Sequence, residues 1–159
     1  MNESVPKSLT DDAVKAYQEG NYENAARLFG EAASAFMERN NPLDAAEMKN
    51  NQSVAWLQAR NPGAAYETAR GTASIFAATG DSRREGIAYG NEAAALQALG
   101  RANDALEKYR LASAAFERAG EDELRATTMQ AMAGIELKRG KVMDALLTMQ
   151  IGLSSVKNP

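Results

Sequence analysis

The sequence contains no cysteine and no histidine. The first absence excludes disulfides, zinc–thiolate sites and thiol chemistry, and the second removes the commonest general base and metal ligand. Aromatic residues make up only 6% of the chain, and prolines number 4. A phosphate-binding glycine loop, a dinucleotide-binding glycine motif and an alternating strand pattern are also missing. These absences predict a helical protein that is not an enzyme and that uses no cofactor or metal ion.

The chain also has no large excess of positive or negative charge and no long apolar run. The 18 basic and 21 acidic residues give a formal net charge of −3, whereas a nucleic-acid-binding domain carries a basic excess. The start of the chain lacks the basic and apolar regions of a secretory signal, and charges interrupt every apolar stretch before it could span a bilayer. We therefore expect a cytoplasmic protein whose partners include neither nucleic acid nor a membrane.

What the sequence does contain is a repeat of 40 residues. Alanine recurs at this spacing, at Ala25, Ala65, Ala105 and Ala145. Phenylalanine follows the same period at Phe36, Phe76 and Phe116, with Val156 in the fourth repeat. Glycine keeps another phase at Gly20, Gly100 and Gly140. Several residue types that share one fixed period indicate an array of stacked units rather than one irregular globule.

Local signals divide each period into two helices. Asn41-Pro42 and Asn61-Pro62 each place an N-cap residue before a proline at the first helical position, and Gly80 suits a left-handed helix end. The expected helices span 9–19, 22–39, 42–59, 62–79, 82–99, 102–119, 122–139 and 142–156. They form one repeat domain over residues 1–159, with hairpins at about 9–39, 42–79, 82–119 and 122–156.

Two segments resemble the tetratricopeptide repeat (TPR) family at the loop and the start of the second helix. They are residues 20–29, GNYENAARLF, and residues 99–109, LGRANDALEKY. The resemblance covers nearly the whole chain, although the period of 40 exceeds the family's usual length of about 34. Longer repeats of this kind occur in kinesin-light-chain-like and vesicle-fusion-adaptor-like members. The resemblance implies an all-α, right-handed α-solenoid of four antiparallel helical hairpins, whose first helices line a concave groove that holds a peptide.

Polar and small residues on the first helices are the candidates for such a groove. A side-chain amide both donates and accepts hydrogen bonds, so it can bind a peptide backbone of any sequence. A glycine one turn away would leave room for the ligand. The alternatives are hydrogen bonds between helices for the asparagines and close approach of a neighbouring helix for the glycines. The candidate groove residues are Asn50, Asn51, Gly86, Gly90, Asn91, Gln97 and Gln130.

The last helix carries two apolar stripes. We expect the larger stripe to pack on the preceding first helix; its members are Val142, Leu146, Met149, Leu153 and Val156. The second stripe, on another face, consists of Met143, Leu147 and Ile151. The earlier repeats carry charged, polar or small residues at most of these second-stripe positions, and a terminal repeat normally needs a polar outer face. We therefore expect a homodimer through the C-terminal helix; the alternative is that the helix rotates so that this stripe helps to fill the core.

These features predict a non-catalytic protein–protein interaction module, a scaffold that presents a concave groove to a peptide or protein partner. Two other functions remain open at this stage. A dedicated chaperone for an exported or assembling subunit would co-purify with one unstable client. A self-assembling structural element would change its size in solution with concentration.

Overall fold

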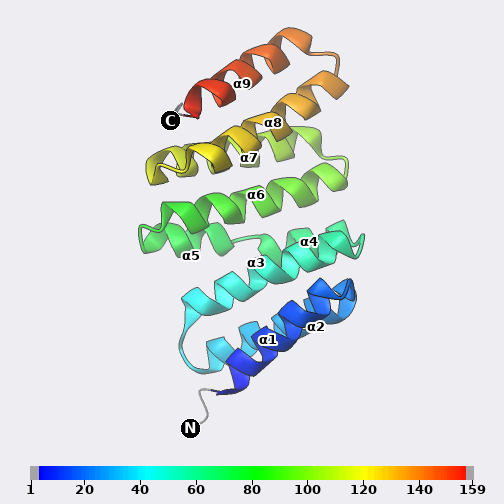
Figure 1. Cartoon of the computed structure of the whole chain (residues 1–159), viewed down its shortest axis with the longest axis vertical. Coiled ribbons are helices and arrows are strands. Elements are labelled where there is room, and N and C mark those ends of the chain that lie inside the picture. The colour runs from blue at the N-terminus through cyan, green and yellow to red at the C-terminus, as the bar shows by residue number, and fades with distance from the viewer. Residues whose placement is uncertain (1–3, 157–159) are drawn as a thin grey trace.

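The structure, a computed structural model, describes residues 4–156, and this part of the chain contains only α-helices. The helices stack in chain order along the longest axis, so the two ends of the chain lie at opposite ends of the stack (Figure 1). No helix among residues 4–156 combines the length and the hydropathy that a membrane span requires. The helices are α1 (Ser4–Gln18), α2 (Tyr22–Glu38), α3 (Pro42–Gln58), α4 (Pro62–Ala69), α5 (Thr72–Ala78), α6 (Ser82–Ala98), α7 (Ala102–Ala119), α8 (Asp122–Lys138) and α9 (Val142–Ser155).

Two of the helices begin at the predicted caps. Side-chain oxygens of Asn41 and Asn61 each accept a hydrogen bond from the backbone N–H three residues later, which satisfies a donor that a helix start leaves open. Asp81, which the sequence analysis did not identify as a cap, does the same at the start of α6. Asn40 and Arg60 adopt the left-handed conformation in two of the turns, with φ of 55° and 60°. Glycines adopt the same conformation in the other turns between hairpins and within them, at Gly20, Gly80, Gly100, Gly120 and Gly140.

The structure differs from the sequence-based helices at two places. The first helix begins at Ser4 rather than at residue 9, because Pro6 lies in the first turn, where a missing N–H costs little. The single helix expected over residues 62–79 is instead two helices, α4 and α5, separated at Arg70 and Gly71. Gly71 adopts a left-handed conformation with φ of 86°, which interrupts the helical hydrogen bonds.

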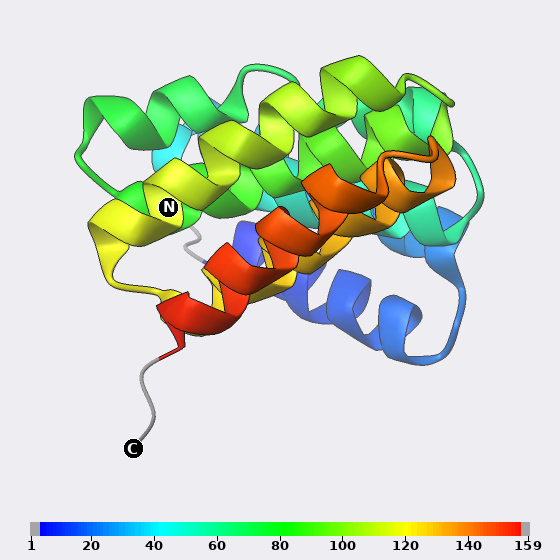
Figure 2. The same ribbon diagram turned by 90° about the horizontal axis from the view of Figure 1, so that it is seen from above.

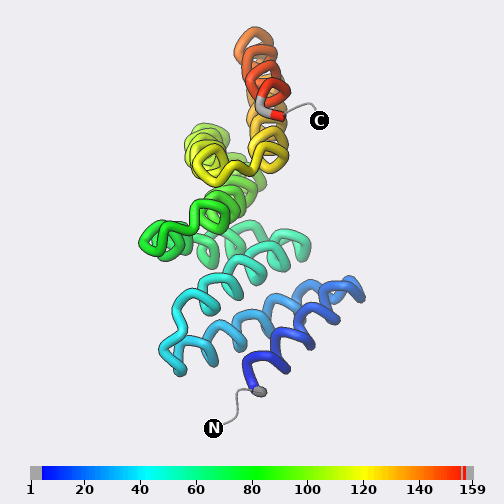
Figure 3. Tube along the Cα trace, turned by 60° about the vertical axis from the view of Figure 1, so that its left-hand side comes forward, coloured from blue at the N-terminus to red at the C-terminus, as the bar shows by residue number. Residues whose placement is uncertain are grey.

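Each helix packs against its neighbours along the chain. The hairpin partners are α1 with α2, α3 with α4 and α5, α6 with α7, and α8 with α9. Each second helix also packs against the first helix of the next hairpin, as α2 does on α3 and α7 on α8. Successive hairpins are rotated relative to one another (Figures 2 and 3). The fold is therefore an all-α solenoid, as the sequence predicts.

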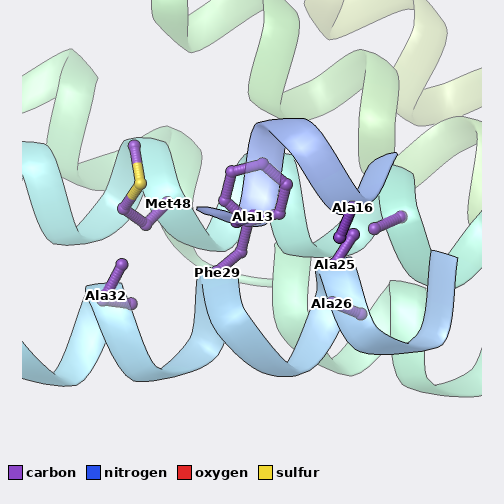
Figure 4. Packing of buried hydrophobic residues seen from close by; sticks show 9 residues of the cluster. Ala13, Ala16, Ala25, Ala26, Phe29, Ala32 and Met48 are labelled. Carbon is purple, nitrogen blue, oxygen red and sulfur yellow. The ribbon is translucent and has the colours of Figure 1, made fainter. Parts of the chain in front are cut away.

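The repeated alanines are fully buried in the stack. Ala25, Ala65, Ala105 and Ala145 are each 0% exposed, so the 40-residue period does place one methyl group in the same buried position of every hairpin. Larger side chains then fill the spaces between helices. In the first cluster, Phe29 and Met48 lie among the alanines of α1 and α2 (Figure 4). Such alternation of small and large side chains allows helices to pack closely.

Candidate functional site

A small cavity opens where α1, α2 and α3 meet. Its volume is about 250 Å³, and it is lined by Val14, Tyr17, Phe29, Asn51 and Val54. Val14 is exposed and Phe29 is buried, so the cavity leads from the surface to the apolar core. The half-buried Asn51 has no hydrogen-bond partner for its side-chain amide among the described residues. One free amide therefore stands beside an apolar recess.

The same helical position in the next first helix is occupied by Asn91. Its side chain is half-buried, and its amide likewise lacks a partner within residues 4–156. One residue earlier, Gly90 faces open space, because a Cβ atom added there would meet nothing within 4 Å. A Cβ on Gly86 would lie 2.6 Å from Cε1 of Phe116. Gly86 therefore makes room for the ring of Phe116 between packed helices, whereas Gly90 leaves the surface beside Asn91 without a side chain.

The other amides predicted for the groove have contacts of their own. Asn50 is buried, and its Oδ1 accepts a hydrogen bond of 2.9 Å from Oγ1 of Thr72. Gln97 accepts one of 3.0 Å from the hydroxyl of Tyr109 across the α6–α7 hairpin. Gln130 is exposed at the edge of another cavity, of about 240 Å³, between α8 and α9. The structure therefore uses Asn50 and Gln97 inside the fold and leaves Asn51 and Asn91 available.

A buried charged pair that the sequence analysis missed lies next to the helix break. Oε1 of Glu92 on α6 accepts a hydrogen bond of 3.3 Å from the backbone N–H of Gly71, and Oε2 lies 2.9 Å from Nζ of Lys108 on α7. Glu92 is only 2% exposed. The carboxylate thus joins α6, α7 and the end of α4, and it provides a partner for an N–H that the break removes from the helix.

The ammonium group of Lys108 is held by this carboxylate. Burial alone lowers the pKa of Lys108, but the hydrogen bonding and charge of Glu92 outweigh burial and raise the pKa above its ordinary value of 10.5. The ammonium also lies 5.5 Å from the ring centroid of Tyr89, a cation–π distance. The carboxylate and the ammonium group are therefore paired with each other inside the fold.

A wide hollow runs along α2 and α3. It has a volume of about 880 Å³, and its lining includes the ion pair of Arg27 and Glu31 together with Gln52 and Trp56. Both partners of the ion pair are well exposed, so the pair contributes little to stability. Among residues 4–156, no group of three carboxylates is placed to hold a metal ion.

The last helix is oriented differently from the sequence-based expectation. The face that packs on α8 carries the small residues Ala145 and Gly152, and a Cβ added to Gly152 would lie 2.8 Å from Cβ of Met129. The larger apolar stripe, which we expected to pack on this helix, is mostly exposed: Val142 at 52%, Leu146 at 53%, Leu153 at 76% and Val156 at 41%. That expectation was wrong, because only small residues allow α9 to approach α8 as closely as in the earlier hairpins.

The second stripe of α9 is also exposed. Met143 is 77% exposed, Leu147 59% and Ile151 38%. The helix therefore presents apolar side chains on both sides of its contact with α8. Larger apolar patches on a surface mark sites of interaction.

Comparisons with known proteins identify the fold. No family model and no curated protein sequence matches the chain. Among solved structures, BtubC (BKLC) from P. vanneervenii matches with a TM-score of 0.82 and 15% identity, over 97% of this chain and 66% of that one. Two crystal structures of a Podosopora anserina protein, described as a kinesin light chain with nearly identical TPR-like repeats, match with TM-scores of 0.79 and 0.78. In both, identity is 17%, and the match covers 96% of this chain and 76% of that one.

These similarities establish a TPR-like α-solenoid. The resemblance that the sequence shows at residues 20–29 and 99–109 is thereby confirmed at the level of the fold, including the likeness to repeats of the kinesin-light-chain type. At identities of 15 to 17%, the likeness concerns the fold alone.

Proposed function

We propose that this chain is a non-catalytic interaction module that binds an extended peptide segment of a protein partner along its first helices. The observation that carries the proposal is the pair of free amides at equivalent positions of α3 and α6, Asn51 and Asn91. Each amide can donate to a carbonyl and accept from an N–H of a peptide in any sequence context. The spacing of one repeat between them suits a ligand that crosses the stack.

The surroundings of the two amides differ, so each would bind a different part of the peptide. Beside Asn51, the cavity between Val14 and Val54 can take one apolar side chain of the peptide. Beside Asn91, the bare surface at Gly90 allows the peptide backbone to approach the helix closely. The peptide would therefore place an apolar anchor near the N-terminal end of the stack and a flat segment near its middle.

The test is a selection of peptides from a random library on the wild-type protein, followed by affinity measurements on variants. Each lost amide contact removes about 0.5–1.5 kcal/mol, so Asn51→Ala and Asn91→Ala should together weaken binding by roughly 10- to 100-fold. Asn21→Ala is the matched control, because the exposed side chain of Asn21 makes no capping hydrogen bond. Selected peptides that bind the double variant as tightly as the wild type would disprove the groove.

We also propose that two copies associate through α9. The support is the extent of apolar surface that this helix leaves exposed on both of its sides. A dimer would carry two peptide-binding faces and would gain avidity for a partner with repeated segments. Sedimentation equilibrium over a range of concentrations tests the association, and a wild-type protein that stays monomeric at high micromolar concentration would contradict it.

A further inference from the structure

One side of α9 corresponds to a contact surface in the preceding repeat. We call it the stacking face, and it consists of Val142, Leu146, Met149, Leu153 and Val156. Forty residues earlier, on α7, the matching positions are Ala102, Leu106, Tyr109, Ser113 and Phe116. Four of those five α7 side chains are buried. Leu106 and Tyr109 lie in one cluster with Met132 and Ile135 of α8, the first helix of the next hairpin, whereas Phe116 lies against α6. The stacking face of α9 is thus built like a surface that another helix covers.

Nothing in the described part of the chain covers this face. Figure 2 looks along the stack and shows α9 on the outside of its end, and the exposure of Leu146 and Leu153 agrees with that position. The face continues into the cavity between α8 and α9, where Met149 and Leu153 meet Met129 and Gln130. A helix laid against α9 would therefore find both an apolar ridge and a recess.

We infer that the helix covering this face is the same face of a second copy, with the two α9 helices antiparallel about a two-fold axis near Met149. The inference rests on the proposed homodimer and states which surface forms it. No residue of the stacking face is ionisable, so self-pairing buries no charge. A symmetric pair of this kind closes on itself and does not continue into a fibre.

The other end of the stack does not fit the stacking face. α1 exposes Lys7, Asp11, Asp12 and Lys15 on its surface. Pairing α9 of one copy with α1 of the next would bring these charges against apolar side chains, and burying an unpaired charge is costly. Pairing α9 with α9 avoids this cost.

The order of side chains along the helix defines the register. When two copies run antiparallel with Met149 at the axis, Val142 of one copy lies opposite Val156 of the other. Leu146 then lies within one residue, or about 1.5 Å along the helix, of the position opposite Leu153. The face is one side of a single helix and is therefore smaller than the interfaces of most stable complexes. The dimer should therefore dissociate on dilution.

Single-cysteine variants test the register directly, because the chain has no cysteine of its own. Leu146→Cys and Leu153→Cys change exposed residues, so both variants should fold normally. With a short bismaleimide, an equimolar mixture of the two should give several times more cross-linked dimer than either alone. A parallel pairing would instead link each variant to itself and would overturn the antiparallel register.

Met143→Cys is the control for this experiment. Met143 lies on the other stripe of α9 and is 77% exposed, so the variant should react fully with a monofunctional maleimide but give little cross-linked dimer. Cross-linking of Met143→Cys as efficient as that of the mixture would overturn the inference.

Charged variants test two questions separately: whether the homodimer forms, and whether the stacking face forms it. Leu146→Glu should weaken dimerisation at least tenfold in sedimentation equilibrium, whereas Leu147→Glu on the other stripe should leave it unchanged. If Leu147→Glu alone dissociates the dimer, the homodimer stands and the stacking face is the wrong surface. If the wild type is monomeric at all concentrations, or if it pairs only with a helix of another protein, both proposals fail.

Discussion

Among single residues, Glu92 is a buried carboxylate whose environment can be tested. Its carboxylate is buried between three helices and depends on Lys108 for its counter-charge. When a buried carboxylate loses its partner, the free-energy cost of its desolvation is no longer offset by the ion pair. The stability of the central hairpins should therefore depend on a cation whose own side chain is 30% exposed.

Lys108→Met tests this dependence, because methionine keeps the length of the side chain and removes its charge. We expect the variant to lose about 2–3 kcal/mol of unfolding free energy in urea titrations, since it leaves Glu92 unpaired. Arg70→Met is the control: Arg70 pairs with Glu67 at the surface, and such a pair contributes less than about 1 kcal/mol. Equal losses in the two variants would contradict the role of Glu92.

The raised pKa of Lys108 predicts how this contribution changes with pH. The folded protein holds the proton more tightly than the unfolded chain, so the contribution is complete below the ordinary pKa of 10.5 and is lost as the pH rises through the folded pKa. We expect the urea midpoint of the wild type to fall more steeply above that pH than the midpoint of Lys108→Met. Both proteins share the same tyrosines, so the difference between them reports Lys108 together with its electrostatic interaction with Tyr66 and Tyr89.

The sequence could not show which polar residues become buried. Asn50 and Asn51 are adjacent and identical, yet neighbouring positions on a helix differ by about 100° in direction. One therefore contacts Thr72 in the interior and the other reaches the surface. Nothing in the sequence indicated that Glu92 is buried, because its burial depends on Lys108 and on a backbone N–H from another hairpin.

At the scale of elements, the break between α4 and α5 is the clearest departure from a regular repeat. The apolar stripe of Ala65, Ala69, Ala73 and Phe76 keeps helical spacing across the break, and all four side chains are buried. The sequence therefore predicted one continuous helix. The break could be recognised only from its tertiary partners, Asn50 and Glu92.

Gly71→Ala should destabilise the protein because Gly71 has a φ of 86°. An alanine in the left-handed region costs about 1–2 kcal/mol, which a shift of the urea midpoint would report. Gly63→Ala provides a control of opposite sign: Gly63 lies in α4 with free space around it, and alanine there favours the helix by up to about 1 kcal/mol. Destabilisation of similar size in both would argue against strain at Gly71.

The orientation of α9 shows a signal that was present in the sequence. Ala145 shares the phase of Ala25, Ala65 and Ala105, and all four are fully buried. The repeat therefore already predicted that small residues of α9 face α8. The large apolar residues of α9 led to the opposite prediction, that they face α8. That prediction was wrong because large apolar residues of a terminal helix need not be buried.

At the scale of the whole molecule, the fixed period determines most of the architecture. Four copies of the same spacing account for the hairpins, their turns and the buried alanines. The binding partner does not follow from this pattern, because stacking residues repeat and binding residues need not. Asn51 and Asn91 repeat only once among the first helices.

The stacked arrangement also predicts that the effect of a core substitution on stability depends on its position along the array. Ala65→Glu or Ala105→Glu would bury a charge at a closely packed site and cost several kcal/mol, about 3 or more. Each central hairpin contacts two neighbours, so these variants should lose more helicity in circular-dichroism melts than Ala25→Glu at the end. Ala77→Glu on the exposed surface of α5 should melt like the wild type. Central variants as stable as the wild type would contradict the stacked arrangement.

The constant repeat length has a mechanical consequence. When an array of nearly independent neighbours is pulled from its ends, its hairpins can give way one at a time. Each hairpin of 40 residues would release a chain with a contour length of roughly 130–140 Å, less its folded extent. Force–extension traces of the single molecule should therefore show steps of uniform length, and the hairpin with the helix break should yield at lower force than its neighbours. The same period that fixes the positions of the alanines thus sets the length by which the molecule extends under load.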